Sequence, residues 1–145
     1  MLRSLLLAAA LGLTVVAAAP QAAHAQSAPA PEQLSDAWAD NIGVQLAEML
    51  RSPSEQHRED ALVLLIDLKR RHGASVDLRA ATGALLTVAE TGPTTGHRML
   101  AITALYEMRD PDALQTLAEQ VVDDPPSPVR RHAARILAAY RATVK

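Results

Sequence analysis

Three times along this 145-residue chain, a proline is followed at the same distances by an arginine, an alanine, a leucine and a basic residue. The three sets are Pro53, Arg58, Ala61, Leu65 and Lys69, then Pro93, Arg98, Ala101, Leu105 and Arg109, and finally Pro125, Arg130, Ala133, Leu137 and Arg141. The second set lies 40 residues after the first, and the third lies 32 residues after the second. Self-similarity at a spacing of about 20 to 50 residues is typical of repeat proteins, whose units bury their apolar faces against one another.

The chain between and around these sets predicts helices. From Leu34 onward, apolar residues recur at three- and four-residue intervals, as on one face of a helix, and no sustained alternation indicates a strand. The sequence has no Phe, one Trp and two Tyr, so its core must consist mainly of Leu, Ala, Val, Ile and Met. Leu, Ala and Met are strong helix formers. The pattern predicts six helices, at about 35–51, 53–72, 76–91, 94–109, 111–122 and 128–143.

Proline and capping residues mark the expected helix starts. Proline is tolerated at the first helical position because its missing N–H has no partner there. The predicted start pairs are Ser52-Pro53, Gly92-Pro93, Asp110-Pro111 and Ser127-Pro128. Ser52 with Glu55 fits a capping box, and Gly73 after a basic run fits a helix end with a left-handed glycine.

The repeat and the six helices together predict the fold. We expect an all-α protein, a short α-solenoid of about three stacked helical hairpins over residues 34–73, 74–110 and 111–145. In the second helix of each hairpin, the small Ala61, Ala101 and Ala133 permit close approach. The leucines one turn later fill the same layer.

The segment from Asp112 to Tyr140 resembles a HEAT repeat, because Pro128-Val129-Arg130 opens its second helix and Ala133 follows three residues later. In HEAT repeats an Asp in the turn commonly bonds the Arg of the second helix, and Asp124 stands where that Asp is expected for Arg130. Ser52 and Gly92 occupy the matching positions of the first two units, which departs from the pattern. Tetratricopeptide arrays are the nearest alternative, but spacings of 40 and 32 do not fit their regular repeat of about 34 residues.

The first 25 residues have the pattern of an export signal. Arg3 precedes an uncharged apolar stretch over residues 5–19, and Ala23, His24 and Ala25 form a small-any-small cleavage pattern. That stretch of about 15 residues is shorter than the roughly 20 that a membrane span needs. We therefore expect a cleavable signal peptide (1–25), a flexible Ala/Pro-rich leader (26–33) and a HEAT-like helical-repeat domain (34–145). The mature protein would be periplasmic or secreted and would not span the membrane.

Composition excludes several function classes. The absence of Cys excludes a disulfide scaffold, a thiol enzyme and a cysteine-ligated metal site. Removing Arg3 with the signal lowers Lys plus Arg from 14 to 13 against 16 Asp plus Glu, a net charge of −3. This charge and the scarcity of aromatic residues argue against nucleic-acid binding. No arrangement of a nucleophile and a base is identifiable, so we predict a non-enzymatic protein without a cofactor.

Histidines carry the one ligand-binding hypothesis. His57 and His97 occupy equivalent repeat positions, and His132 lies three residues past the third equivalent position, so a column of imidazoles is conceivable. Metal binding would require them to converge on one ion. The simpler interpretation is that His57 and His97 are polar residues in the first turns of their helices.

The exposed side of the second helices is the predicted partner-binding face, since these helices line the inner side of HEAT-like arrays. Opposite the buried Ala and Leu positions lie two or three residues in each helix. They are Asp60, Val63, Asp67, Leu100, Thr103, Glu107, His132 and Arg135. Val63 and Leu100 are unexpected on a solvated face and suggest a protein partner.

Three functional hypotheses follow. The first is an interaction or scaffold module that binds another envelope protein or associates with itself. The second is an accessory protein that binds a small ligand, metal or cofactor in the concave face. A phycobilin-lyase-like enzyme is a third, supported only by the analogy that some lyases carry HEAT-like repeats.

Overall fold

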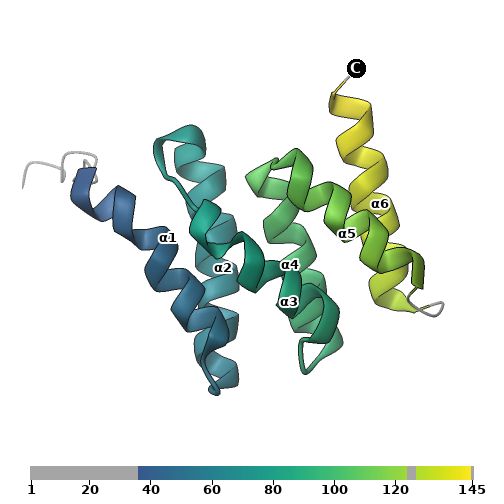
Figure 1. Cartoon of the computed structure of the whole chain (residues 1–145), viewed down its shortest axis with the longest axis horizontal. Helices are drawn as coiled ribbons and strands as arrows, with labels where there is room; N and C mark the ends of the chain where they lie inside the picture. Colours follow the sequence, from purple (N-terminus) through teal and green to yellow (C-terminus); the bar gives the residue numbers. More distant parts are fainter. Residues whose placement is uncertain (1–35, 124–126, 145) are drawn as a thin grey trace, which may run out of the picture. The chain divides into compact units, whose positions relative to one another are not determined.

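The computed structural model describes residues 36–123 and 127–144. These ranges contain six α-helices, two short 3₁₀ helices and no β-strand (Figure 1). The α-helices are α1 (Asp36–Arg51), α2 (Glu55–His72), α3 (Thr82–Thr91), α4 (Thr95–Met108), α5 (Pro111–Asp123) and α6 (Pro128–Thr143), and the 3₁₀ helices are η1 (Gly73–Ser75) and η2 (Arg79–Ala81). The predicted all-α fold with six helices is confirmed.

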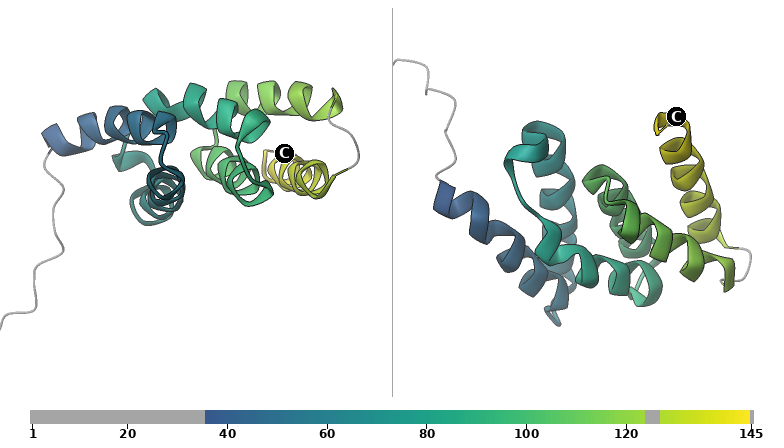
Figure 2. Two further views of the ribbon diagram at one scale, coloured as in Figure 1. Left: turned by 90° about the horizontal axis from the view of Figure 1, so that it is seen from below. Right: turned by 45° about the horizontal axis from the view of Figure 1, so that its top comes forward.

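The helices form two layers. Helices α1, α3 and α5 lie in one layer, here called the odd layer, and α2, α4 and α6 lie in the other, the even layer (Figure 2, left). Each helix packs against its hairpin partner and against the next helix of its own layer, and α4 lies at the centre against α2, α3 and α6. Three hairpins stacked in this way form a short α-solenoid, as the repeat predicts.

The described residues do not include the segments that the sequence links to export. The predicted signal peptide (1–25) and leader (26–33) lie outside the described residues, and their assignment stays a prediction. None of the helices that the structure describes combines the length and apolar composition needed to cross a membrane.

Two of the four predicted helix starts are wrong by two residues. Helix α2 is capped by Ser54, whose Oγ accepts the His57 N–H at 3.4 Å, rather than by Ser52. Helix α4 is capped by Thr94, whose Oγ1 accepts the His97 N–H at 3.1 Å, rather than by Gly92. In both cases a hydroxyl residue directly after the proline is the better cap, because it supplies an acceptor for an unpaired N–H of the first turn.

The other two predicted starts are confirmed. Ser127 caps α6 by accepting the Arg130 N–H at 3.1 Å, with Pro128 opening the helix. The Asp110 carboxylate accepts the N–H groups of Asp112 and Ala113 at 3.0 and 3.3 Å at the start of α5. Here the proline follows the capping residue directly, as the first helical position allows.

The predicted helix over 76–91 begins only at Thr82. The preceding residues form η1, an extended stretch and η2, with Val76 and Leu78 fully buried. Lys69 Nζ donates to the carbonyls of Gly73 and Val76 at 3.0 and 3.1 Å, which satisfies backbone groups that a helix would otherwise pair. The apolar residues here therefore belong to an irregular link (73–81), which lies within the unit that has the longer, 40-residue spacing.

The repeated alanine and leucine positions form the centre of the core. Ala61, Ala101 and Ala133 are all fully buried, as predicted. Leu65 and Leu105 are also buried, whereas their equivalent in the last hairpin, Leu137, is only partly buried against the core.

The repeated arginines have a defined structural role in the first two units. In the first unit, Arg58 Nη1 donates to the carbonyl of Ser52, directly after the end of α1. In the second unit, Arg98 Nε donates to the carbonyl of Ala89, in the last turn of α3, at 2.9 Å. Carbonyls at a helix end lack intrahelical partners. Each arginine thus ties the second helix of its hairpin to the end of the first, where the family pattern has an Asp. Asp124, the expected Asp of the third unit, lies outside the described residues.

Candidate protein-interaction face

The predicted face lies along the even layer. We call its eight residues the even-layer face: Asp60, Val63 and Asp67 on α2; Leu100, Thr103 and Glu107 on α4; His132 and Arg135 on α6. Two pairs of side chains join neighbouring helices across this face, so the structure places its three parts side by side.

Arg70 and Glu107 join α2 to α4. Arg70 Nε donates to Glu107 Oε1 at 2.8 Å, and Nη2 lies 2.7 Å from the same oxygen. The Arg70 side chain is 60% exposed and that of Glu107 is 19% exposed. An ion pair this open to solvent contributes only about 0–1 kcal/mol to the free energy of folding. It does, however, mark which residues of α2 and α4 lie opposite each other.

Thr103 and His132 join α4 to α6. Thr103 Oγ1 donates to the Met99 carbonyl at 3.0 Å and lies 3.0 Å from His132 Nε2. The two contacts are compatible when Nε2 of a neutral imidazole carries the proton and donates it to the hydroxyl oxygen. Burial lowers the pKa of His132 below its ordinary value of 6.5, and the nearby positive charge of Arg135 lowers that pKa further.

The lowered pKa of His132 makes stability pH-dependent. The unfolded chain binds a proton at this histidine more readily than the folded chain, so this contribution to stability is complete above pH 6.5 and is lost as pH falls below that value. We expect the urea midpoint to fall more in the wild type than in His132→Gln between about pH 7.5 and 5.5. Equal slopes for both proteins would contradict this assignment, and an NMR titration of His132 measures its pKa directly.

Val63 and Leu100 differ in their surroundings. Val63 is 53% exposed at the middle of α2, as expected of a residue on this face. The expectation that Leu100 also lies open to solvent is wrong, because Leu100 is partly buried and packs against the core.

Charge changes sign along the even-layer face. Asp60 accepts a hydrogen bond from Gln56 Nε2 at 2.8 Å, and Asp67 pairs with Arg71 Nε at 2.8 Å one turn further along α2. At the other end of the face, Arg135 is exposed on α6. A partner that contacts the whole face would meet acidic groups on the first hairpin and basic groups on the last.

The three histidines do not form a column. His57 is exposed with its Nδ1 3.3 Å from Ser52 Oγ, and His97 is buried with its Nδ1 2.6 Å from Thr94 Oγ1. His132 instead faces Thr103 on the neighbouring helix. Each imidazole thus has its own hydroxyl neighbour. Within the described residues, no group of three or more His, Asp or Glu side chains is placed to hold a metal ion.

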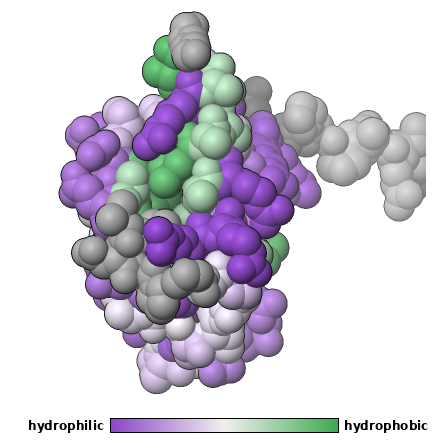
Figure 3. Space-filling view, turned by 90° about the vertical axis from the view of Figure 1, so that its right-hand side faces the viewer, coloured by the Kyte–Doolittle hydropathy of each residue, from purple (hydrophilic) through white to green (hydrophobic). Residues whose placement is uncertain are grey.

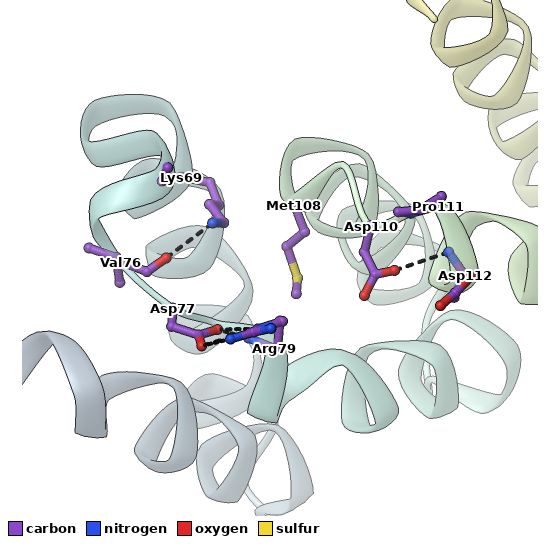
Figure 4. Close-up of a pocket in the computed structure, with 9 residues that line it drawn as sticks. Lys69, Val76, Asp77, Arg79, Met108, Asp110, Pro111 and Asp112 are labelled. Atoms are coloured by element: carbon purple, nitrogen blue, oxygen red, sulfur yellow. Dashed lines mark hydrogen bonds and ion pairs between the residues drawn. The ribbon is translucent and has the colours of Figure 1, made fainter.

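A groove that sequence reasoning missed lies between the 73–79 link and the α4–α5 turn (Figure 4). It has a volume of about 540 Å³, and Asp110 and Asp112 line one side while Lys69, Asp77 and Arg79 line the other. The Arg79 guanidinium donates to the Asp77 carboxylate at 2.6 Å and lowers its pKa to about 2. On that side of the groove, Arg79 and Asp77 therefore bond to each other. A helix over 76–91 would not have formed this groove, so the sequence pattern gave no signal for it.

Comparison with known proteins identifies the repeat. Residues 44–138 match the family model for HEAT repeats. No curated protein and no solved structure matches the chain significantly. The match covers the second hairpin completely and the first and last hairpins in part.

Proposed function

Because the chain belongs to the HEAT-repeat family, whose repeats commonly mediate protein–protein interaction or scaffolding, we propose that it is a non-enzymatic protein-binding module of the cell envelope. HEAT-repeat proteins are typically scaffolds rather than enzymes. The partner is another envelope protein, and it binds the even-layer face.

The observation that carries this proposal is Val63, a large apolar side chain held in the open at the middle of a charged face. Asp60 and Asp67 flank it one turn away on each side, and the Arg70–Glu107 pair lies beyond them. An apolar centre within a polar rim is the usual composition of a protein interface. Leu100 on the neighbouring helix adds a partly covered apolar surface to the same area.

The envelope location rests on the amino-terminal sequence. The apolar stretch over 5–19 and the cleavage pattern ending at Ala25 support export. If this is correct, the protein isolated from its host begins at Gln26. The mass of the intact protein tests this directly, and a mass that retains residues 1–25 contradicts it.

Val63→Glu tests the face. A buried, unpaired carboxylate at an interface centre costs several kcal/mol, so we expect partner binding to weaken by at least about a hundredfold. Binding is measured by native mass spectrometry and titration of the partner that co-isolates from the envelope. Val44→Glu is the matched control, because Val44 is an exposed valine of nearly equal exposure, 52%, on α1 in the odd layer.

The two variants separate the hypotheses. Loss of binding in Val63→Glu but not in Val44→Glu supports the even-layer face. Equal binding by both variants places the partner elsewhere. A monomer that carries a fixed small extra mass would instead favour the accessory ligand-binding function, with the groove of Figure 4 as the first place to substitute.

A further inference from the structure

Both ends of the solenoid expose positions that its interior buries. Leu64 on α2 is 38% exposed, whereas its equivalent 40 residues later, Ala104 on α4, is 1% exposed. At the other end, Ala134 on α6 is exposed, whereas its equivalents Leu62 and Ile102 are fully buried. The even layer therefore presents one uncovered repeat surface at α2 and the opposite one at α6.

The two side-chain bonds between even-layer helices share one register. Counted from Pro53 and Pro93, Arg70 is position 17 of its repeat and its partner Glu107 is position 14. Counted from Pro93 and Pro125, Thr103 is position 10 and its partner His132 is position 7. In both junctions, a residue of one helix meets the residue three positions earlier in the next helix.

The same register predicts what α6 would meet in a following α2. Position 10 of the last repeat is Arg135, and position 7 of the first repeat is Asp60. Ala142, at position 17 of the last repeat, would meet Asp67, at position 14 of the first, with the exposed Arg141 adjacent to it. The uncovered end at α6 is thus basic where the uncovered end at α2 is acidic.

An apolar groove accompanies these charges at the α6 end. It has a volume of about 310 Å³ between α5 and α6, and its apolar lining includes Leu114, Ala118, Leu137 and Val144. Figure 3 shows an apolar patch on this side of the molecule, bordered by strongly hydrophilic residues. The equivalents of Leu137 in the first two hairpins, Leu65 and Leu105, are buried.

We propose that the occupant of this end is a second copy of the chain, stacked head to tail so that its α2 packs against α6 and Asp60 pairs with Arg135. This inference rests on the proposed function as a protein-binding module and names the chain itself as one partner. A head-to-tail contact uses two different surfaces and does not close on itself, so association continues beyond a dimer into open assemblies.

Charge reversal at the two ends tests the proposal. Analytical ultracentrifugation measures the mass of the assembly as a function of protein concentration. The protein is expressed from the 145-residue sequence and purified after the host has processed it. We expect the wild-type mass to rise with concentration past that of a dimer, and to rise less at high salt because exposed ion pairs are screened. Asp60→Arg and Arg135→Glu should each weaken association at least about tenfold, since each places like charges opposite one another.

Mixing the two variants gives the decisive result. In an equimolar mixture, each junction between unlike variants again pairs a basic with an acidic side chain at positions 135 and 60, so association should return toward the wild-type level through assemblies in which the variants alternate. Glu90→Arg, the same charge change at an exposed site on α3, is the control and should associate normally. Circular dichroism verifies that all variants are helical.

Several outcomes would overturn the proposal. They are a wild type that stays monomeric, a mass that stops at a dimer, or a mixture that stays as monomeric as its components. Val63→Glu separates this inference from the proposed function. Val63 is position 10 of its repeat, which in the register above lies on the side of α2 nearer the next helix of its own chain, so this substitution should leave self-association unchanged. A wild type that stays monomeric would overturn this inference and would leave the proposed binding of another protein at the even-layer face untouched.

Discussion

Replacing Leu65 with Ala lowers the free energy of unfolding by about 2–5 kcal/mol. Leu65 is almost fully buried at the repeated leucine position of α2, within the core that α1, α2 and α4 share. Truncation removes apolar area from the core and leaves a cavity that the surrounding helices fill only in part. Because a domain of this size is stable by only about 5–15 kcal/mol, this is a large share of the total. Urea denaturation followed by circular dichroism measures it.

Leu64 is the matched control, one residue earlier on the same helix. Its side chain is exposed at the end of the even layer, so Leu64→Ala should change the free energy of unfolding by less than about 1 kcal/mol. Both variants make the same chemical change in the same helix, so differences in helix propensity cancel. Equal losses for the two would mean that the orientation of α2 is wrong.

Replacing Gly43 with Ala destabilises the protein, although Ala is the better helix former. A Cβ at position 43 would lie 2.7 Å from the Asp77 carbonyl oxygen and 3.2 Å from the Leu78 Cα, and both atoms belong to backbone. The link must therefore move away from α1, which we expect to cost about 1–3 kcal/mol, more than the gain of about 1 kcal/mol in helix propensity. Thermal and urea unfolding both measure the net loss.

Gly83 gives the opposite expectation. It lies in α3, and a Cβ there has no heavy atom within 4 Å. Gly83→Ala should stabilise the protein by up to about 1 kcal/mol. If both glycine variants stabilise the protein, then α1 does not pack closely against the link.

Sequence reasoning predicted the features that follow from repetition. Ala61, Ala101 and Ala133 align in the sequence and are all fully buried, because each occupies the same place between stacked hairpins. The positions that face away from this core also follow from helical geometry, which is how Val63 is found on the even-layer face.

The errors arise where tertiary contacts decide. Leu100 has the angular position of a surface residue, but it packs partly buried against the core. The periodicity of a single helix does not describe packing of this kind. The Ser52 cap is wrong because two hydroxyl residues flank Pro53, and only the geometry of the turn selects Ser54. The groove beside the 73–79 link was missed because a helix was predicted from residue 76 onward, whereas residues 76–81 form an irregular stretch and a 3₁₀ helix in which Val76 and Leu78 are buried.

The link between α2 and α3 restricts where this chain can be engineered. It is the longest connection within the described residues 36–123, and loop length alone would make it the natural place to insert a tag or a second domain. Its backbone, however, is held by Lys69 and lies against Gly43. Insertions are tolerated where backbone is exposed and unbonded, so the exposed Pro93 turn is the better graft point.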